Sequence, residues 1–465
     1  MPEEIRQPDV GGHSVPQPTS RPYNRAAWLS FGTTTAVALA VYLSTLAPNV
    51  TLEWSGILST GATYAGISPP PGYPAWTIFS WLFIKLLPFA NIAWRVSVGS
   101  AMATSISCGL IALMIARWGP ILFSETPAFV ALKPAQRDWL CAVSGGVAGL
   151  LLAFSKVVWE MAVVAEIWAL SLLLFVGVLA LLAQWALYPR RRWIVFAAFF
   201  LFGLLLTNSQ QMIVALPGLV CAVMLVDCKL GRDLAIAVLP LATLATLANQ
   251  PALWIRFPDR VNWPISLGFT SVFVLGVILI FYTRRLGTEW KPASLCVVGV
   301  LLGLAAYLYV PIASMSNPPV NWGYARTAEG FLHVISRGQF ERMSPTIDLG
   351  LFGSQLLQFA SATPKQVGWP CLAFVAAAAF SIYRMNRLGL RWLVGVFIIW
   401  VCVGPLMVAE LNPPPDRQAQ ELIELYFGSA HVIFALWAGI GMVWLGANLS
   451  RGNEKRLVQA QSQAE

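Results

Sequence analysis

The sequence predicts an all-α, polytopic membrane bundle, and three observations lead to this fold class. Of the 465 residues, 57% are hydrophobic and only 11% are charged, with a mean hydropathy of +0.67, whereas a soluble domain carries about 25% charge. Apolar runs long enough to cross a bilayer recur along nearly the whole chain. In lipid each backbone polar group must be satisfied within its own segment, so an open chain spans the membrane as helices.

These runs predict about 12 to 13 membrane helices. We place the spans near 28–47, 96–117, 139–155, 166–187, 193–207, 211–226, 234–250, 264–282, 293–312, 366–382, 392–409 and 428–447. Residues 74–87 are apolar but short, and their Trp76, Trp81 and Lys85 suit a membrane boundary. We therefore expect this segment to lie along or partly within the outer interface, with a true span as the alternative.

Basic residues set the expected orientation, because Lys and Arg are enriched in cytoplasmic loops. The clusters that fall on the side of the N-terminus are Arg21 with Arg25, Arg190 to Arg192, Lys229 with Arg232, Arg284 and Arg285 with Lys291, Arg384 with Arg387 and Arg391, and Arg451 with Lys455 and Arg456. The outer loops are then 48–95, about 156–165, about 251–263, 313–365 and 410–427. Since the net charge of +9 is spread over these short clusters, it does not indicate nucleic-acid binding.

The expected domain organisation is simple. Residues 1–25 are polar and rich in Pro, Gly, Ser and Gln, which predicts a disordered cytoplasmic N-terminus. Residues 26–450 form the transmembrane domain, whose first helix we expect to be retained, and 451–465 form a cytoplasmic tail. The seven Cys lack CxxC spacing and are expected to be small buried hydrophobes. The three His are far apart, so we predict no metal site from them, and a divalent cation remains unassigned.

The first outer loop carries the first candidate for chemistry. Glu53 follows the first span, and the loop ends in the rigid turn Pro69-Pro70-Pro71-Gly72-Tyr73-Pro74. A carboxylate at this place can act as a general base toward an acceptor hydroxyl. The structural alternative is an exposed loop carboxylate.

Further carboxylates lie in and just after the second predicted outer loop, at about 156–166. Glu166 stands where a long apolar helix begins, and a carboxylate entering a membrane helix is costly enough to be a functional candidate. The alternative is that it stabilises the helix N-terminus. Lys156 is four residues before Glu160, a spacing that favours an ion pair on one helix face.

Two polar segments complete the candidates. The run Thr207-Asn208-Ser209-Gln210-Gln211 is either a tight polar turn or the lining of a hydrophilic cavity. The loop after Tyr309 carries prolines, flat aromatic rings suited to a sugar and cations that can meet phosphate. Its candidate binding residues are Asn317, Asn321, Trp322, Arg326 and Arg337. The alternative is an ordered loop that packs on the bundle.

Taken in order, these segments resemble a known membrane family. The best-matching pieces are Pro70-Pro71-Gly72-Tyr73-Pro74, Ala93-Trp94-Arg95-Val96, Ala165-Glu166-Ile167-Trp168-Ala169-Leu170, Gly203 to Asn208 and the loop from Asn317 to Gly323. The chain is similar over residues 40–345, and more weakly at Tyr426 to Ala430, to a bacterial family of the GT-C glycosyltransferase superfamily. That family is in turn similar to the eukaryotic transmembrane protein O-mannosyltransferase.

The resemblance implies a GT-C fold in a bacterial cytoplasmic membrane, with an active-site cavity at the outer leaflet. It implies a polyprenyl-phosphate donor that carries a hexose such as mannose. It also implies an acceptor protein or glycan, whose identity does not follow from the sequence. In these roles we expect Glu53 as the base, with Glu166 as second choice, Arg95, Arg326 and Arg337 at the phosphate, and Tyr73, Asn208 and Trp322 around the sugar.

The chain departs from the family pattern in the first loop. The family has Asp-Ser-Gly-Glu where this chain reads Trp54-Ser55-Gly56-Ile57. The family's His before Pro-Pro-Gly-Tyr-Pro is Pro69 here, and the His that often follows Thr-Asn is Ser209. Glu53 is one residue before the expected Asp and could replace it through a small shift of the loop. The alternative function is therefore a non-catalytic GT-C-fold protein that binds a lipid-linked glycan or an envelope partner.

Overall fold

The structure is a computed structural model, and it describes residues 24–52, 54–238, 263–340 and 344–464. Within these ranges the regular structure is helical, apart from one isolated parallel bridge between Ile67 and Asn321. The predicted all-α bundle is thus confirmed. Glu53 and much of the predicted span 234–250 lie outside the described residues.

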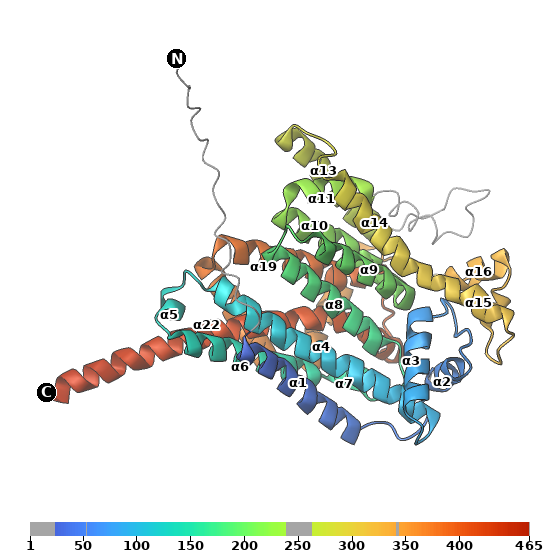
Figure 1. Ribbon diagram of the computed structural model, residues 1–465, viewed down its shortest axis with the longest axis horizontal. Coiled ribbons are helices and arrows are strands. Elements are labelled where there is room, and N and C mark those ends of the chain that lie inside the picture. Colours follow the sequence, from blue (N-terminus) through green and yellow to red (C-terminus); the bar gives the residue numbers. More distant parts are fainter. Residues whose placement is uncertain (1–23, 53, 239–262, 341–343, 465) are drawn as a thin grey trace, which may run out of the picture.

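The first half of the chain forms the larger part of the bundle (Figure 1). Its helices are α1 (Arg25–Ser44), α2 (Ser55–Thr63), α3 (Pro74–Leu86), α4 (Ile92–Leu122), α5 (Pro127–Val130), α6 (Pro134–Ala153), α7 (Lys156–Ala162), α8 (Trp168–Leu187), α9 (Arg192–Asn208), the 3-10 helix η1 (Gln210–Ala215), α10 (Leu216–Val226) and α11 (Cys228–Ala237). Helix α4 is the central element, because 83% of its most apolar window is buried by its neighbours.

The second half begins after the undescribed residues 239–262. Its elements are α13 (Trp263–Thr283), α14 (Trp290–Leu304), η2 (Ala305–Leu308), α15 (Tyr309–Met315), η3 (Trp322–Tyr324), α16 (Ala328–Ile335), α17 (Leu349–Val367), α18 (Trp369–Ser381), η4 (Ile382–Arg384), α19 (Arg387–Val401), η5 (Cys402–Leu406), α20 (Met407–Leu411), α21 (Arg417–Glu424), η6 (Leu425–Phe427) and α22 (Gly428–Ala464). Helix α22 therefore continues without a break into the predicted cytoplasmic tail 451–465.

The described helices account for most of the predicted membrane spans. Seven are long and apolar enough to cross a bilayer alone, and two bent helix pairs, α6 with α7 and α17 with α18, meet the same condition only when each pair is taken together. Two shorter apolar segments, Arg192–Asn208 and Gln210–Val226, match the predicted spans 193–207 and 211–226. The chain is therefore an integral membrane protein, and within the described ranges fewer helices than the predicted 12 to 13 are long enough to cross alone.

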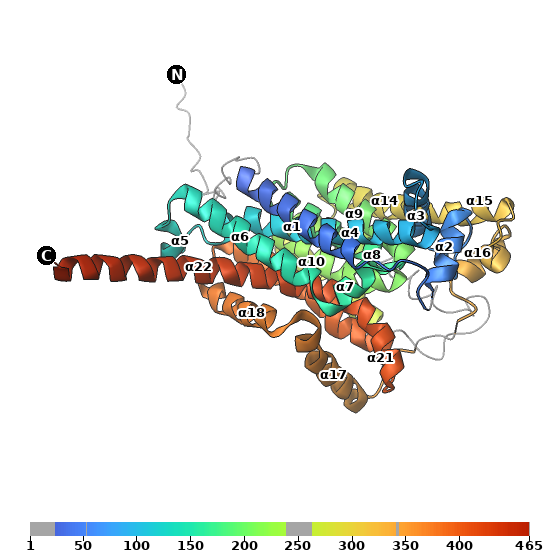
Figure 2. The same ribbon diagram turned by 90° about the horizontal axis from the view of Figure 1, so that it is seen from below.

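The sharper of the two bends has a local cause. Helix α17 ends at Gly368, whose φ of 84° is readily adopted only by glycine, and Pro370 follows in the first turn of α18. The two helices meet at 111°, so α17 turns away from the bundle (Figure 2). The predicted span 366–382 corresponds to α18, and α17 lies in what the sequence predicts as an outer loop.

Close helix packing in the bundle depends on glycines at the contacts. A Cβ added at Gly145 would lie 2.4 Å from the Ala112 carbonyl oxygen, and one at Gly149 would lie 2.5 Å from that of Cys108. These two glycines are one turn apart on α6, so their face lets the backbone of α6 approach α4. Small residues at such spacing are typical of helix pairs in membranes.

Helix α3 lies across one end of the bundle rather than along it (Figure 1). It has 13 residues, too few to cross a bilayer of about 30 Å in a straight helix. This placement agrees with the interfacial position predicted for 74–87. Helices α2, α15 and α16 gather at the same end, which we call the α3 end.

Candidate active site

Three loop regions that are far apart in the sequence meet at the α3 end. The Ile67 amide donates to the Val320 carbonyl at 2.8 Å, and the Trp322 amide donates to the Ile67 carbonyl at 3.3 Å. The indole N–H of Trp76 on α3 donates to the Glu166 carbonyl at 2.9 Å. The sequence-based expectation that the 48–95 loop, the 156–166 corner and the 313–345 loop converge on one face is confirmed.

Tyr73 occupies the centre of this junction. It precedes Pro74, the first residue of α3, and has a left-handed backbone with φ of 42°. The pKa of its phenol is raised to about 12, mainly by burial; the Arg337 guanidinium opposes this rise, and Tyr426 and Glu166 add to it. We call Tyr73, Glu166, Arg337 and Tyr426 the Tyr73 cluster, since each of the other three groups acts on the pKa of this phenol.

The acidic member of the cluster is Glu166, just before the N-terminus of α8. Its side chain is half-buried, and its backbone is held by the bond from Trp76. The carboxylate therefore lies near the positive end of the α8 dipole, as predicted. That position alone also suits a purely structural role. The chemical hypothesis for Glu166 depends on the other members of the cluster, Arg337 and Tyr73.

The basic member, Arg337, is fixed by its backbone and by an aromatic ring. Its φ is 58°, its amide donates to the Val334 carbonyl at 3.1 Å, and its guanidinium lies 5.3 Å from the centre of the Phe340 ring. Within the described ranges this guanidinium makes no ion pair. Its N–H groups can therefore take an anionic ligand such as a phosphate.

The first outer loop reaches the same ring. Trp54 packs edge-on against Phe340 with ring centres 6.3 Å apart. Trp54 directly follows the predicted base Glu53. The residue after Glu53 therefore packs against the segment that carries Arg337. The position of the Glu53 carboxylate itself is outside the described residues.

Polar and aromatic groups surround the cluster. Gln210 donates to the Tyr307 hydroxyl at 3.0 Å and to the Ile335 carbonyl at 2.7 Å, which joins η1 to the loop before Arg337. Tyr426 lies edge-on to Trp168, with ring centres 4.3 Å apart. These contacts hold the cluster between α8, the start of α22 and the loop 317–340.

The loop candidates lie beside the cluster with different exposures. Asn321 accepts from the Ser314 hydroxyl at 2.8 Å, and the half-buried Trp322 donates its indole N–H to Gln339. Arg326 is exposed and donates weakly to Asn317 at 3.4 Å. Trp322 therefore presents a ring held in place, whereas Arg326 and Asn317 lie at the rim.

Two predicted binding residues have structural partners instead. Arg95 donates to the carbonyls of Phe89 and Ala90 at 2.8 Å each and to that of Ile84 at 3.3 Å, so its guanidinium closes the loop after α3. The fully buried Asn208 donates to the Ile167 carbonyl at 2.9 Å and to the Ser171 hydroxyl at 2.7 Å, which holds the start of α8. The predicted pair of Lys156 with Glu160 is wrong, because Lys156 binds Glu424 at 3.1 Å.

Sequence reasoning missed Tyr307, Gln210 and Tyr426 as members of this site. Gln210 lies in the polar run 207–211, which is a candidate as a whole, and Tyr426 lies in the outer loop 410–427, whose residue pattern indicates no role. Among the described residues, no group of three or more His, Cys, Asp or Glu side chains is placed to hold a metal ion.

Comparison with known proteins places this site in context. Residues 55–231 match the family described as the protein O-mannosyl-transferase TMEM260 N-terminal domain. The chain is 32% identical to protein O-mannosyl-transferase TMEM260 of Mus musculus over 149 residues, which are 31% of this chain and 18% of the mouse protein. It is 23% identical to the Dictyostelium discoideum protein of that name over 310 residues, 64% of this chain and 29% of the relative.

The matched segment 55–231 contains Tyr73 and Glu166, whereas Arg337 and Tyr426 lie beyond it. The chain spans less than a third of the length of these curated relatives, at 18% and 29%. The predicted resemblance to the eukaryotic transmembrane protein O-mannosyltransferase is confirmed.

Proposed function

We propose that this chain is a membrane glycosyltransferase that moves a sugar, a hexose such as mannose, from a polyprenyl-phosphate donor to a hydroxyl of an acceptor protein or glycan. The observation that carries the proposal is that the segment with a carboxylate, Glu166, is bonded to α3 just after Tyr73, while the loop with a cation, Arg337, is bonded to the same end of the bundle. Glycosyl transfer needs both kinds of group close together. The similarity to proteins named protein O-mannosyl-transferase supports the same reaction class.

The proposed reaction breaks the bond between the sugar C1 and the phosphate oxygen and forms a bond from C1 to the acceptor oxygen. The acceptor proton passes to a carboxylate, for which Glu53 is the first candidate and Glu166 the second. Negative charge builds on the leaving polyprenyl phosphate, where Arg337 stabilises it. Trp322 offers a flat face to the sugar, and Arg326 at the rim can meet the donor as it enters.

The proposed location is the cytoplasmic membrane of a bacterium, with the N-terminus in the cytoplasm and the α3 end outside. The support is the distribution of charge, since the basic residues Arg190 to Arg192 lie between α8 and α9, and Arg387 and Arg391 lie in the first turns of α19, at helix ends away from α3. The bacterial membrane stays a prediction, because the relatives compared above are eukaryotic.

The test is transfer by the purified, reconstituted chain from a radiolabelled polyprenyl-phosphate mannose to peptide or glycan acceptors. Glu166→Gln keeps the size of the side chain and removes its basicity, so transfer should fall by roughly 100-fold if Glu166 is the base. Glu160→Gln is the matched control, because Glu160 is an exposed carboxylate on the adjoining α7. An unchanged rate for Glu166→Gln assigns the role to Glu53, which Glu53→Gln tests in the same assay.

A non-catalytic role is the second candidate, and specific observations favour it. The first loop reads Trp54-Ser55-Gly56-Ile57 where the resembling family has two carboxylates. Arg95 and Asn208 are already bound to backbone carbonyls. Saturable binding of the polyprenyl-phosphate sugar without transfer to any acceptor would support this role and contradict the enzyme proposal.

A further inference from the structure

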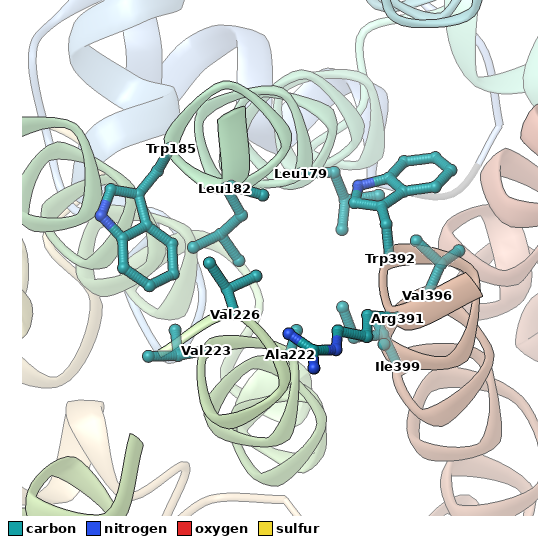
Figure 3. Close-up of a pocket in the computed structure, with 12 residues that line it drawn as sticks. Leu179, Leu182, Trp185, Ala222, Val223, Val226, Arg391, Trp392, Val396 and Ile399 are labelled. Atoms are coloured by element: carbon teal, nitrogen blue, oxygen red, sulfur yellow. The ribbon is translucent and has the colours of Figure 1, made fainter. Parts of the chain in front are cut away.

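A second hollow lies at the other end of the bundle, between α8, α10 and α19 (Figure 3). Its volume is about 30 Å³, so it is a narrow slot between the helices. Leu182 and Trp185 come from α8, and Val226 comes from α10. Trp168 of the candidate active site is about 25 Å away along α8. We call this hollow the α8–α10–α19 groove, and it belongs to no part of the site described above.

The groove is apolar except for one side chain. Its walls are aliphatic and indole groups, and the indole N–H of Trp185 is already donated to the Pro189 carbonyl at 3.2 Å. Such a lining offers too few hydrogen bonds to select a sugar or a nucleotide. It suits a hydrocarbon chain, whose burial needs no polar partner.

The exception is Arg391, in the second turn of α19. Its side chain reaches across the hollow toward Ala222 (Figure 3). Among the described residues it has no side-chain hydrogen bond and no ion pair, and it is exposed. A guanidinium at the edge of an apolar groove predicts an amphiphile with an anionic head, because its fork of donors matches phosphate.

The groove is formed before any ligand arrives. Trp392 stacks on Trp118 of α4 with ring centres 4.9 Å apart and planes 18° apart, which fixes one wall. At Gly395 an added Cβ would lie 3.2 Å from the Ala222 Cβ, so α10 and α19 are in close contact there. A preformed hollow binds without the cost of ordering its walls.

The surroundings indicate which amphiphile is available. Arg384 and Arg387 are exposed just before Arg391, and tryptophans at this level are typical of a membrane–water boundary. Basic side chains next to membrane helices attract anionic lipids. We propose that the α8–α10–α19 groove binds one anionic glycerophospholipid, with an acyl chain along the groove and the phosphate on Arg391.

The test uses the full chain in nanodiscs of equal parts phosphatidylglycerol and phosphatidylcholine, followed by release into detergent and native mass spectrometry. The wild type should retain one phosphatidylglycerol in preference to phosphatidylcholine. Arg391→Gln should lower that retention by about 10-fold or more, the scale of a lost charge-assisted bond. Arg384→Gln removes a neighbouring exposed charge outside the groove and should retain lipid like the wild type.

A second variant keeps the test decisive if Arg391→Gln does not fold. Val226→Phe fills the groove without changing the charge, so it should also lose the retained lipid. Equal retention of both lipids by the wild type, or wild-type retention in both variants, would overturn the proposal. So would preferential retention of a polyprenyl phosphate when that lipid is added in equal amount.

Discussion

Two arginines illustrate how much a residue's role depends on its partners. The sequence predicts both Arg95 and Arg337 as phosphate ligands. In the structure Arg95 is bound to three backbone carbonyls, whereas Arg337 lies over the Phe340 ring and has no ion pair among the described residues. A backbone carbonyl acceptor cannot be recognised from the sequence, because every residue has a backbone carbonyl. Sequence reasoning therefore finds the residue type that the chemistry needs but cannot tell which copy is already engaged.

This difference gives a direct prediction for Arg337. Arg337→Gln removes the cation proposed to stabilise the leaving phosphate, so transfer should fall by roughly 100-fold to 1,000-fold. Arg326→Gln, at the exposed rim, should reduce transfer much less. The measurement is the initial rate with saturating polyprenyl-phosphate mannose. Equal losses of transfer rate in the two variants would show that the loop acts only through its total positive charge and that Arg337 has no specific role.

The phenol of Tyr73 predicts a pH dependence of stability. Its pKa rises from 10.0 to about 12 in the folded chain, mainly through burial. The neutral phenol is therefore favoured by folding, and this contribution is complete below pH 10 and is lost as the pH rises toward 12. The wild type should lose more thermal stability than Tyr73→Phe between about pH 10 and pH 12. An equal loss of thermal stability in both proteins would contradict the burial of the phenol and indicate that it is in contact with solvent.

At the scale of elements, glycines decide which helices pack closely. Helix α14 carries the chain to the loop that holds Arg337, and it contacts α9 through Gly303 and Gly203. A Cβ at Gly303 would lie 2.4 Å from the Phe200 carbonyl oxygen, and one at Gly203 would lie 2.2 Å from that of Val300. Neither contact tolerates a side chain without separating the helices.

Gly303→Val should therefore destabilise the protein by about 1–3 kcal/mol or more, the usual cost of overpacking. It should also lower transfer, because α14 positions the loop 317–340. Gly32→Ala on α1 is the matched control, since no atom lies within 4 Å of its added Cβ. That change should be neutral or stabilise by up to about 1 kcal/mol. Thermal unfolding in detergent measures both, and similar stabilities for the two variants would contradict this account of α9–α14 packing.

The helices themselves were largely predictable, for a physical reason. An apolar run of span length has few alternatives in lipid, so α1, α4, α8 and α13 begin and end within a few residues of the predicted spans. The bends and short helices were not predicted. They depend on local features such as Gly368 and on how neighbouring helices cover segments that are too short to span alone.

At the scale of the whole molecule, loops from separate parts of the sequence build one site. Basic clusters fall in alternate loops, which predicts that the loops between them share the opposite face of the membrane. Contacts such as Ile67 to Val320 and Trp76 to Glu166 confirm that these loops converge. The membership of Tyr426 and Tyr307 was not predictable. Their positions follow from tertiary packing across hundreds of residues, which no local pattern encodes.

The same arrangement makes a prediction about the two faces of the membrane. Of the seven cysteines only Cys228, at the start of α11, is exposed. If the basic end is cytoplasmic, a membrane-impermeant maleimide should label the wild type only after the membrane is permeabilised. Lys85→Cys in a Cys228→Ser background should react without permeabilisation, because Lys85 is an exposed residue near the end of α3, which lies across the bundle.

Glu329→Cys in the same background is the matched control, since Glu329 is exposed on α16 at the α3 end whatever the path of α3. Labelling of both variants from outside is the expected result. If Glu329→Cys reacts from outside and Lys85→Cys only after permeabilisation, α3 crosses the membrane and a later segment must compensate, so that the loop with Glu329 keeps its predicted side. Protection of Glu329→Cys, with labelling only after permeabilisation, would place the Arg337 loop on the inner side, and the hydrogen bond between Ile67 and Val320 would bring the Tyr73 turn to that side with it.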